Sequence, residues 1–394
     1  MLSMVDRKHL EEQLKNAFYW FHENPELSYE EYQTTEKIRE FLQNYGIEIL
    51  PYDLETGLVA IVRGAKKGPV QMLRCDIDAL PIREQTAFPY RSKKEGKMHA
   101  CGHDMHIAAG LGCAVLLQEN REKLHGTVKI IFQPAEESSL GALKILETDA
   151  MQDVDLVWGF HADPTNDVGV IGIREGYVTA AVDRFVITVK GIGCHGAHPD
   201  DGIDPILVSA AIVQALQSII SRNVNAFHPA LLSVTRIHAG TTWNVIPPEA
   251  VMEGTVRTME REDRILYEKK VKEIAEKTAQ AYGAEAVVEW IAGPPATYNN
   301  KQMADLCEQK AKEHGLQTVP EESSMGGDDF AFYEDENTMG RKVPGCYVKI
   351  GTGAGCPIHH PSFEVKPEVL LPTAEYLTEI MLGGSLEIYK KLQQ

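Results

Sequence analysis

Apolar residues in the first part of the chain have the spacing of amphipathic helices and then of short buried strands. Helical spacing covers about Arg7 to Glu23 and about Ser28 to Tyr45, where Gly46 provides a C-terminal cap. Further on, a helix over Asp104 to Lys123 stands among strands at Leu58 to Arg63, Val70 to Cys75, Thr127 to Phe132 and Asp155 to Phe160. Strands that alternate with helices build α/β layers, so we expect a mixed, mostly parallel sheet with flanking helices.

The pattern changes near Asp183. A β-α-β-β-α-β order follows, with elements at Phe185 to Lys190, Pro205 to Arg222, Leu231 to His238, Val251 to Arg257, Glu262 to Tyr282 and Ala286 to Ile291. This order is typical of a ferredoxin-like α+β domain. Because 394 residues exceed the usual size of one core, we expect that domain, at 183–295, to interrupt a discontinuous domain formed by 1–182 and 296–394. The first pattern returns with a helix at Lys301 to His314 and a strand at Cys346 to Ile350.

Reactive side chains follow the predicted strands of the first domain. They are Asp76 and Asp78 after one strand, Glu136 and Glu137 after the next, and His161 after a third. Ligands of such sheets bind outside the carboxyl ends of the strands. We therefore expect these side chains to share one site.

The segment from His99 to His106 holds the densest group of candidate metal ligands, namely three histidines, one cysteine and one aspartate. Cys101 and His103 flank Gly102, which has no side chain to crowd a site to which both could point. Any one of these residues alone would more often be a packed or partnered core residue. Their density instead favours one half of a metal site.

Glu136 and Glu137 are adjacent, so their side chains diverge and suit different roles. One carboxylate can bind metal while the other takes a proton from water. The alternative is a pair of acidic residues at a helix N-terminus, which the helix dipole favours. His161 and His359 are weak signals individually, because a lone histidine is more often structural.

Composition and charge exclude several classes of function. Hydrophobic content of 43% and charged content of 24% are ordinary for a globular protein. A net charge of -18 argues against nucleic acid or anionic membrane as a partner, but a local cation still permits an anionic small substrate. Seven scattered cysteines suggest no disulfide framework and favour the cytoplasm. The polar segment Met1 to Leu14 predicts no secretory signal, and we expect no apolar run near the ~20 residues that span a bilayer.

Several ordered motifs extend over nearly the whole chain. They are Arg74 to Pro81, His99 to Asp104, Gln133 to Glu137, Gly193 to Pro199, Asn244 to Pro247, Gly254 to Arg257 and His359 to Phe363. Together they resemble the M20 metallopeptidase family, in particular the amidohydrolase branch with N-acyl-amino-acid and N-acetyl-diaminopimelate deacetylases, hippurate hydrolases and auxin-conjugate hydrolases. The resemblance implies a zinc-peptidase-like catalytic domain with an inserted lid that commonly mediates dimers.

The resemblance also implies roles for individual residues. Two divalent metal ions, zinc or manganese first and cobalt or nickel as further candidates, would be held by Cys101, His103, Glu137, His161 and His359, with the Cys101 thiolate as a bridge. The choice of His359 over His360 follows the His-x-Pro-x-aromatic motif. Glu136 would be the general base, and Asp78 would orient a ligand.

Three residues of the predicted lid complete the implied site. His195 would stabilise the oxyanion, in its own subunit or in that of a partner, and Asn244 and Arg257 would hold the substrate's carboxylate or carbonyl. A solvated loop is the alternative for His195. Relatives commonly carry glycine where Ser138 and Ser139 follow the glutamate pair, which affects specificity more than chemistry.

The sequence therefore predicts a homodimeric, metal-dependent amidohydrolase that cleaves N-acyl, most simply N-acetyl, amino acids. A dipeptidase or an aminoacylase for larger or aromatic acyl groups would use the same centre. A metal-binding homologue without catalysis would normally lack the base, whereas Glu136 is present. A structural zinc protein would close its site with four ligands.

Overall fold

The computed structural model describes residues 6–392. The first five residues of the segment Met1 to Leu14, which predicts no secretory signal, lie outside the described residues. The chain divides into two compact units. The first contains the residues up to Val178, Tyr298–Glu322 and the residues from Asp329 on, and the second contains Thr179–Thr297 and Ser323–Asp328. The second unit is thus slightly wider than the expected 183–295 and includes a short segment from the C-terminal part of the chain.

A ten-stranded sheet forms the centre of the first unit, in the order β1-β2-β4-β3-β5-β16-β14-β7, with β6 beside β16 and β15 beside β6. Strand β3 pairs in parallel with β4 and β5, and β5 with β16, while β2 pairs antiparallel with β4. The sheet is therefore mixed and mostly parallel at its centre, as predicted. The strands are β1 (Glu48–Ile49), β2 (Leu58–Arg63), β3 (Lys66–Asp76), β4 (His125–Gln133), β5 (Leu156–Asp163), β6 (Val170–Ile173), β7 (Gly176–Thr179), β14 (Thr297–Asn299), β15 (Gln317–Pro320) and β16 (Gly345–Gly351).

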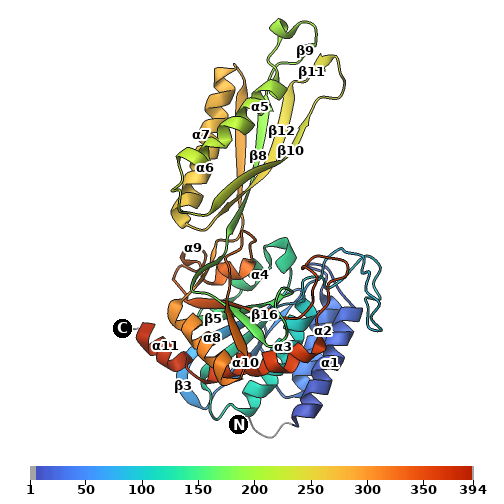
Figure 1. Cartoon of the computed structure of the whole chain (residues 1–394), viewed down its shortest axis with the longest axis vertical. Coiled ribbons are helices and arrows are strands. Elements are labelled where there is room, and N and C mark those ends of the chain that lie inside the picture. Colours follow the sequence, from blue (N-terminus) through green and yellow to red (C-terminus); the bar gives the residue numbers. More distant parts are fainter. Residues whose placement is uncertain (1–5, 393–394) are drawn as a thin grey trace. The chain divides into compact units, whose positions relative to one another are not determined.

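Helices cover both faces of this sheet (Figure 1). Leu73 belongs to the core formed with α1, α3 and α10, whereas its neighbour Met72 belongs to the core formed with α4 and the 3-10 turn Asp329–Tyr333. This alternation follows from the two-residue period of a strand. The helices are α1 (Arg7–Glu23), α2 (Tyr32–Asn44), α3 (His103–Glu119), α4 (Gly141–Leu146), α8 (Lys301–Glu313), α9 (Glu336–Met339), α10 (Leu370–Leu382) and α11 (Ser385–Leu392).

Two helices begin at positions that shape the site. Helix α2 begins at Tyr32 rather than Ser28, because the preceding chain turns through Tyr29, which has a φ of +67°. Helix α3 begins at His103, after Gly102 with a φ of +88°. A Cβ at Gly102 would lie 2.7 Å from the Cβ of Ala162. Only glycine fits this approach of the α3 start to β5.

The second unit has a four-stranded antiparallel sheet in the order β10-β12-β8-β13. Helices α5 (Pro205–Leu216) and α7 (Arg261–Ala281) supply core residues that pack on it. A two-stranded ribbon joins β9 to β11. The remaining elements are α6 (Ser218–Arg222), β8 (Ala181–Lys190), β9 (Cys194–His195), β10 (Ala230–Ala239), β11 (Val245–Ile246), β12 (Glu249–Thr258) and β13 (Glu285–Ala292). Strand and helix order are those of the ferredoxin-like arrangement.

One stretch of the second unit approaches the length of a membrane span. Pro205–Arg222 covers 18 residues with a mean hydropathy of 1.3, and it is the single such helical stretch within residues 6–392. The sequence predicted an element with these bounds, but no apolar run near the length of a membrane span was expected. In the structure it is divided into α5 and α6, and Val208, Ile212, Leu216 and Ile219 pack in the core of this unit.

Candidate metal centre

The carboxyl ends of four adjacent strands carry polar side chains. Asp76 at the end of β3 is paired with Gln133 at the end of β4, and His161 on β5 is paired with Lys349 on β16. The first unit therefore brings the predicted site residues that follow β3, β4 and β5 to one edge of the sheet.

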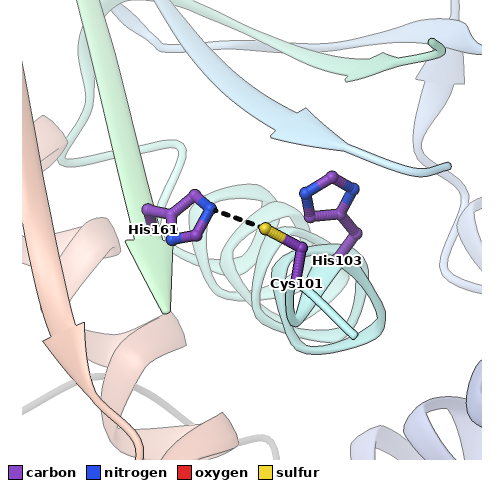
Figure 2. A group of neighbouring side chains, drawn as sticks. All are labelled: Cys101, His103 and His161. Carbon is purple, nitrogen blue, oxygen red and sulfur yellow. Dashed lines mark hydrogen bonds between the residues drawn. The ribbon is translucent and has the colours of Figure 1, made fainter. Parts of the chain in front are cut away.

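Cys101 and His103 reach this edge from the start of α3. The Sγ atom of Cys101 lies 3.3 Å from Nε2 of His161, and His103 stands beside them (Figure 2). All three side chains are buried. One ligand atom from each of the three residues lies within 4.8 Å of the other two. This is the spacing expected of ligands around one metal ion.

Hydrogen bonds fix the tautomers of both histidines. His161 donates from Nδ1 to the backbone oxygen of Ala162 at 2.7 Å, and His103 donates from Nδ1 to the backbone oxygen of Asp78 at 2.8 Å. In its neutral form each imidazole therefore presents the lone pair of Nε2, the arrangement that a metal-binding histidine usually has. The buried Nε2 atom of His103 has no hydrogen-bond partner among the described residues.

The glutamate pair lies on a short turn after β4. Asp78 accepts the backbone N–H of Glu136 at 3.1 Å and that of Glu137 at 3.0 Å, and the hydroxyl of Ser28 donates to Asp78 at 2.7 Å. One carboxylate oxygen of each glutamate lies 3.9 Å from Nε2 of His103. The buried Oε1 atom of Glu137 has no hydrogen-bond partner within residues 6–392. Two buried polar atoms without hydrogen-bond partners among the described residues thus lie 3.9 Å apart, which suits a cation.

His359 approaches Glu137 from the C-terminal part of the chain. Its Nε2 lies 3.5 Å from Oε1 of Glu137, and its side chain is 49% exposed. The residue has a φ of +62°, and its backbone N–H donates to the oxygen of Ala100 at 2.7 Å. His359 also forms a group with Cys101 and Glu137 in which the ligand atoms lie within 4.8 Å of one another.

Charges around the cluster favour a cation. Burial opposes charge on His103, but Asp76 and Asp78 outweigh burial and raise the pKa of this imidazole well above its usual range. Burial raises the pKa of the Cys101 thiol, so this sulfur needs a nearby cation to ionise. Burial keeps the pKa of His161 well below its usual range, and its ring is neutral.

Comparison with known proteins decides the family. A profile of peptidase family M20/M25/M40 matches residues 72–383. The chain belongs to this family.

Individual M20 relatives and structures match nearly the whole chain. N-acetylcysteine deacetylase of Bacillus subtilis (strain 168) is 45% identical over 360 residues, which cover 91% of this chain and 93% of that protein. Thermostable carboxypeptidase 2 of Saccharolobus solfataricus is 38% identical over 375 residues, or 93% of each chain. The crystal structure of the Bacillus subtilis YXEP protein, described as a dinuclear metal binding peptidase from the M20 family, has a TM-score of 0.86 and 41% identity and covers 96% of this chain and 99% of that one.

These findings support the binding of two divalent metal ions by this M20 chain. Two ligand groups overlap at Cys101, one with His103 and His161 and the other with Glu137 and His359. The solved relative is described as dinuclear. The donor set of thiolate, imidazole and carboxylate suits transition metals but does not select one.

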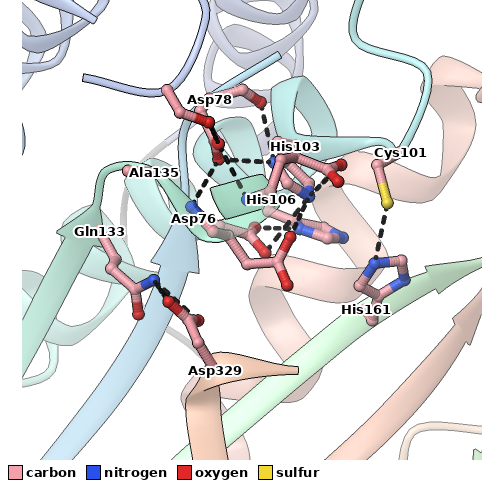
Figure 3. Close-up of polar contacts among 12 residues, drawn as sticks. Asp76, Asp78, Cys101, His103, His106, Gln133, Ala135, His161 and Asp329 are labelled. Carbon is pink, nitrogen blue, oxygen red and sulfur yellow. Dashed lines mark hydrogen bonds and ion pairs between the residues drawn. The ribbon is translucent and has the colours of Figure 1, made fainter. Parts of the chain in front are cut away.

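A buried network lies behind the M20 site, and of its charged members only Asp76 was predicted from the sequence to share the site. Arg74 is fully buried and forms ion pairs with Asp76 at 2.6 Å and with Asp329 at 2.9 Å. Gln133 donates to both carboxylate oxygens of Asp329 at 2.9 Å (Figure 3). Burial would raise the pKa of Asp76, but Arg74 and neighbouring histidines hold it well below its usual range.

His106 belongs to the candidate metal-ligand segment His99 to His106, but in the structure it contacts this network. Its Nδ1 donates to Asp76, and its Nε2 accepts the backbone N–H of Ala162 at 2.9 Å. Both ring nitrogens are therefore used within the protein. His106 supports the backbone beside His161 and leaves no lone pair for a metal.

The three predicted lid residues all belong to the second unit. His195 is exposed on β9 and pairs with Val245, and Asn244 accepts the backbone N–H of Gly196 at 2.8 Å through its own backbone oxygen. Arg257 on β12 is partly buried, and burial lowers the pKa of its guanidinium. Their roles toward substrate stay predictions.

Proposed function

We propose that this M20 protein hydrolyses the amide bond of N-acyl amino acids to give a carboxylate and the free amino acid. The observation that carries the proposal is the buried convergence of Cys101, His161 and His103, with the Glu136 carboxylate 3.9 Å from Nε2 of His103. A relative that is 45% identical is an N-acetylcysteine deacetylase. An acetyl group on an amino acid with a free carboxylate is the simplest substrate.

We assign the metal ligands as Cys101, His103, Glu137, His161 and His359. Two ligand groups that share Cys101 support this assignment, and these five side chains would hold the ions. Zinc and manganese are the first candidates, followed by cobalt and nickel. When bound, such ions supply Lewis acidity at the acyl carbonyl and the attacking water.

Glu136 is the general base of the proposed reaction. Its carboxylate accepts a proton as water attacks the acyl carbon, and it returns the proton to the leaving amine nitrogen as the C–N bond breaks. Asp78 supports this role because it fixes the backbone N–H groups of both Glu136 and Glu137. His195 donates a hydrogen bond to the developing oxyanion, while Asn244 and Arg257 bind the substrate's carboxylate or carbonyl.

A second candidate is hydrolysis of a peptide bond. A carboxypeptidase that is 38% identical over 93% of this chain favours this candidate. Its chemistry would be the same, because only the leaving amine and the acyl group differ.

A substrate panel separates the two candidates. Zinc- and manganese-loaded protein is incubated with N-acetyl, N-benzoyl and dipeptide forms of the same amino acids, and mass spectrometry follows release of the free amino acid. We expect the highest kcat/KM for an N-acetyl amino acid. Faster cleavage of dipeptides would favour the peptidase, and no cleavage of any compound would overturn the proposed function.

We also expect a homodimer that forms through the second unit, in the cytoplasm. Strand β10 is an edge of its sheet, and the exposed apolar side chains of this unit include Phe227 at 92% and Trp243 at 94%. Light scattering on the purified protein measures the mass of the assembly. The expected location rests on the cysteines, all seven of which lie within the described residues and are free thiols.

A further inference from the structure

The turn that carries Glu136 and Glu137 has a left-handed residue at each end. Ala135 has a φ of +55° and Ser139 a φ of +61°. Residues other than glycine adopt this region at a cost in free energy, so the surrounding structure has to impose it. The contacts of this turn therefore show what holds the two glutamates in place.

Two buried carboxylates accept the backbone N–H groups of three successive residues of the turn. Asp78 accepts those of Glu136 and Glu137, and Oε1 of Glu31 accepts that of Ala135 at 2.8 Å. Figure 3 shows Asp78 and Ala135 on the same side of the cluster. Hydrogen bonds from N–H to an ionised carboxylate are stronger than those between neutral groups, and Asp78 has a lowered pKa because His103 and other donors outweigh its burial. The turn thus depends on Glu31 as well as on Asp78.

Glu31 is itself held firmly. Its backbone oxygen accepts the N–H of Thr35 at 2.9 Å and the hydroxyl of the same residue at 2.6 Å, while Oε2 accepts the hydroxyl of Thr56 at 2.8 Å. A Cβ on Gly57 would lie 2.6 Å from Cδ of Pro134, so this loop abuts the start of the turn. Glu31 therefore connects the beginning of α2 to the turn through short, directed contacts.

The surroundings of Glu31 oppose ionisation of its carboxyl group. Glu31 is 0% exposed, and burial and the nearby Asp78 raise its pKa to about 7. Burying a charge beside a like charge is unfavourable. A buried carboxyl group with a perturbed pKa next to a candidate active site is typical of a residue that serves function.

We propose that Glu31 is a positioning residue for hydrolysis. Its hydrogen bond to Ala135 fixes the turn so that the carboxylates of Glu136 and Glu137 face Cys101 and His103. The proposal rests on the proposed function, which makes Glu136 the base and Glu137 a ligand. Glu31 itself has no role as a ligand or in binding substrate.

Three variants of Glu31 test this role. Glu31→Ala removes the acceptor, Glu31→Asp keeps the charge but withdraws it by one methylene, and Glu31→Gln keeps an oxygen that can accept the N–H of Ala135. We expect kcat for an N-acetyl amino acid to fall ~30- to 100-fold in the first two, with KM changed less than ~3-fold, and to stay within ~3-fold in Glu31→Gln. If Glu31→Ala fails to fold, the comparison of kcat between Glu31→Asp and Glu31→Gln tests the proposal.

Glu26→Ala is the matched control. Glu26 is 7% exposed and accepts hydrogen bonds from the N–H of Thr34 at 2.8 Å and from the side chain of Gln33 at 3.1 Å. Among the described residues it makes no hydrogen bond to the turn. We expect its loss to lower the melting temperature but to leave kcat within ~3-fold, since the reacting groups do not move. An equal loss of kcat in Glu26→Ala and Glu31→Ala, or in Glu31→Gln and Glu31→Ala, would overturn the proposal.

Zinc affinity provides a second readout without substrate. In competition with a chelating dye, Glu31→Ala and Glu31→Asp should bind zinc ~10- to 100-fold more weakly than Glu31→Gln and Glu26→Ala. If the wild-type protein cleaves no N-acyl amino acid, the proposed function fails, and the zinc affinities alone test the positioning role of Glu31. Equal affinities in all four variants would then overturn the positioning role.

Discussion

The sulfur of Cys101 lies 3.3 Å from Nε2 of His161, although 60 residues separate them in the sequence. Cys101 precedes α3, whereas His161 is near the end of β5. The approach is possible because Gly102 lets the start of α3 lie against Ala162. A thiol and an unprotonated imidazole nitrogen this close are a ready pair of ligands once a cation ionises the thiol.

Replacement of Cys101 should therefore remove metal as well as activity. We expect Cys101→Ala to lower zinc occupancy and to reduce kcat/KM at least ~100-fold, because the loss of a direct ligand exceeds the effect of its supporting contacts. Elemental analysis of the dialysed protein measures occupancy. Cys113→Ala is the control, since Cys113 is also a buried cysteine but lies within α3 and belongs to the hydrophobic core. Full occupancy in Cys101→Ala would contradict the assignment.

Asp78 should affect the rate more than binding of substrate. In Asp78→Asn, an amide NH₂ replaces one of the two oxygens that accept the N–H groups of Glu136 and Glu137. We expect kcat to fall ~10- to 100-fold with a smaller change in KM. Steady-state kinetics beside Ser28→Ala, which removes only the hydroxyl donor to Asp78, measure the difference. Equal, small effects in both variants would argue against this role of Asp78.

The longer strands along the chain could be predicted because burial imposes local periods on the sequence. Strand β3 ends at Asp76 and β4 at Gln133, close to the predicted ends, so the polar residues after them could be placed at one edge of the sheet. The family motifs then indicated roles for Cys101, His103 and Glu137. The short strands β6, β7, β14 and β15 were missed, because three or four residues carry too little periodicity.

Long-range polar contacts could not be predicted in this way. Arg74 and Asp329 form a buried ion pair although 255 residues separate them. Glu31 likewise meets Ala135 from the start of α2, 104 residues away. No local spacing distinguishes these side chains from exposed ones, since their partners are defined only by the folded chain.

The buried ion pairs of Arg74 should contribute far more to the unfolding free energy than a surface ion pair does. We expect Arg74→Met to lose ~3–5 kcal/mol of unfolding free energy, because the buried carboxylates of Asp76 and Asp329 would lose the positive charge of Arg74. Arg63→Met, which removes an exposed ion pair with Glu48, should cost less than ~1 kcal/mol. Urea unfolding of both variants gives the comparison. Similar losses would show that Arg74 stabilises the fold no more than a surface residue does.

The stability of the first unit should depend on pH through His22. Burial lowers the pKa of His22, but its hydrogen bonds to Asp104 at 2.6 Å and Glu84 at 3.2 Å outweigh burial and raise it to about 9. Because the folded pKa exceeds the unfolded value of about 6.5, this contribution is complete below pH ~6.5 and is lost as pH rises through ~9.

The variant His22→Gln isolates this contribution. We expect the wild-type protein to lose roughly 3 kcal/mol more stability than the variant between pH 6 and pH 10. In the wild-type protein Asp104 and Glu84 are ionised at pH 6, since contact with His22 lowers the pKa of each carboxyl despite burial. Urea unfolding at three pH values measures the unfolding free energy of both proteins. If this free energy changes with pH in parallel in the two proteins, His22 makes no such contribution.

The most direct test of metal-dependent hydrolysis with Glu136 as the base combines metal content with turnover in Glu136→Gln. Chelated wild-type protein and the variant are titrated with zinc, and metal content and release of amino acid from an N-acetyl amino acid are measured at each step. Glu122→Gln, with a side chain that is 76% exposed, is the control. We predict that all three proteins bind two equivalents and that only Glu136→Gln loses activity, by ~100-fold or more. Activity near that of the wild type in Glu136→Gln, or full activity without metal, would contradict the mechanism.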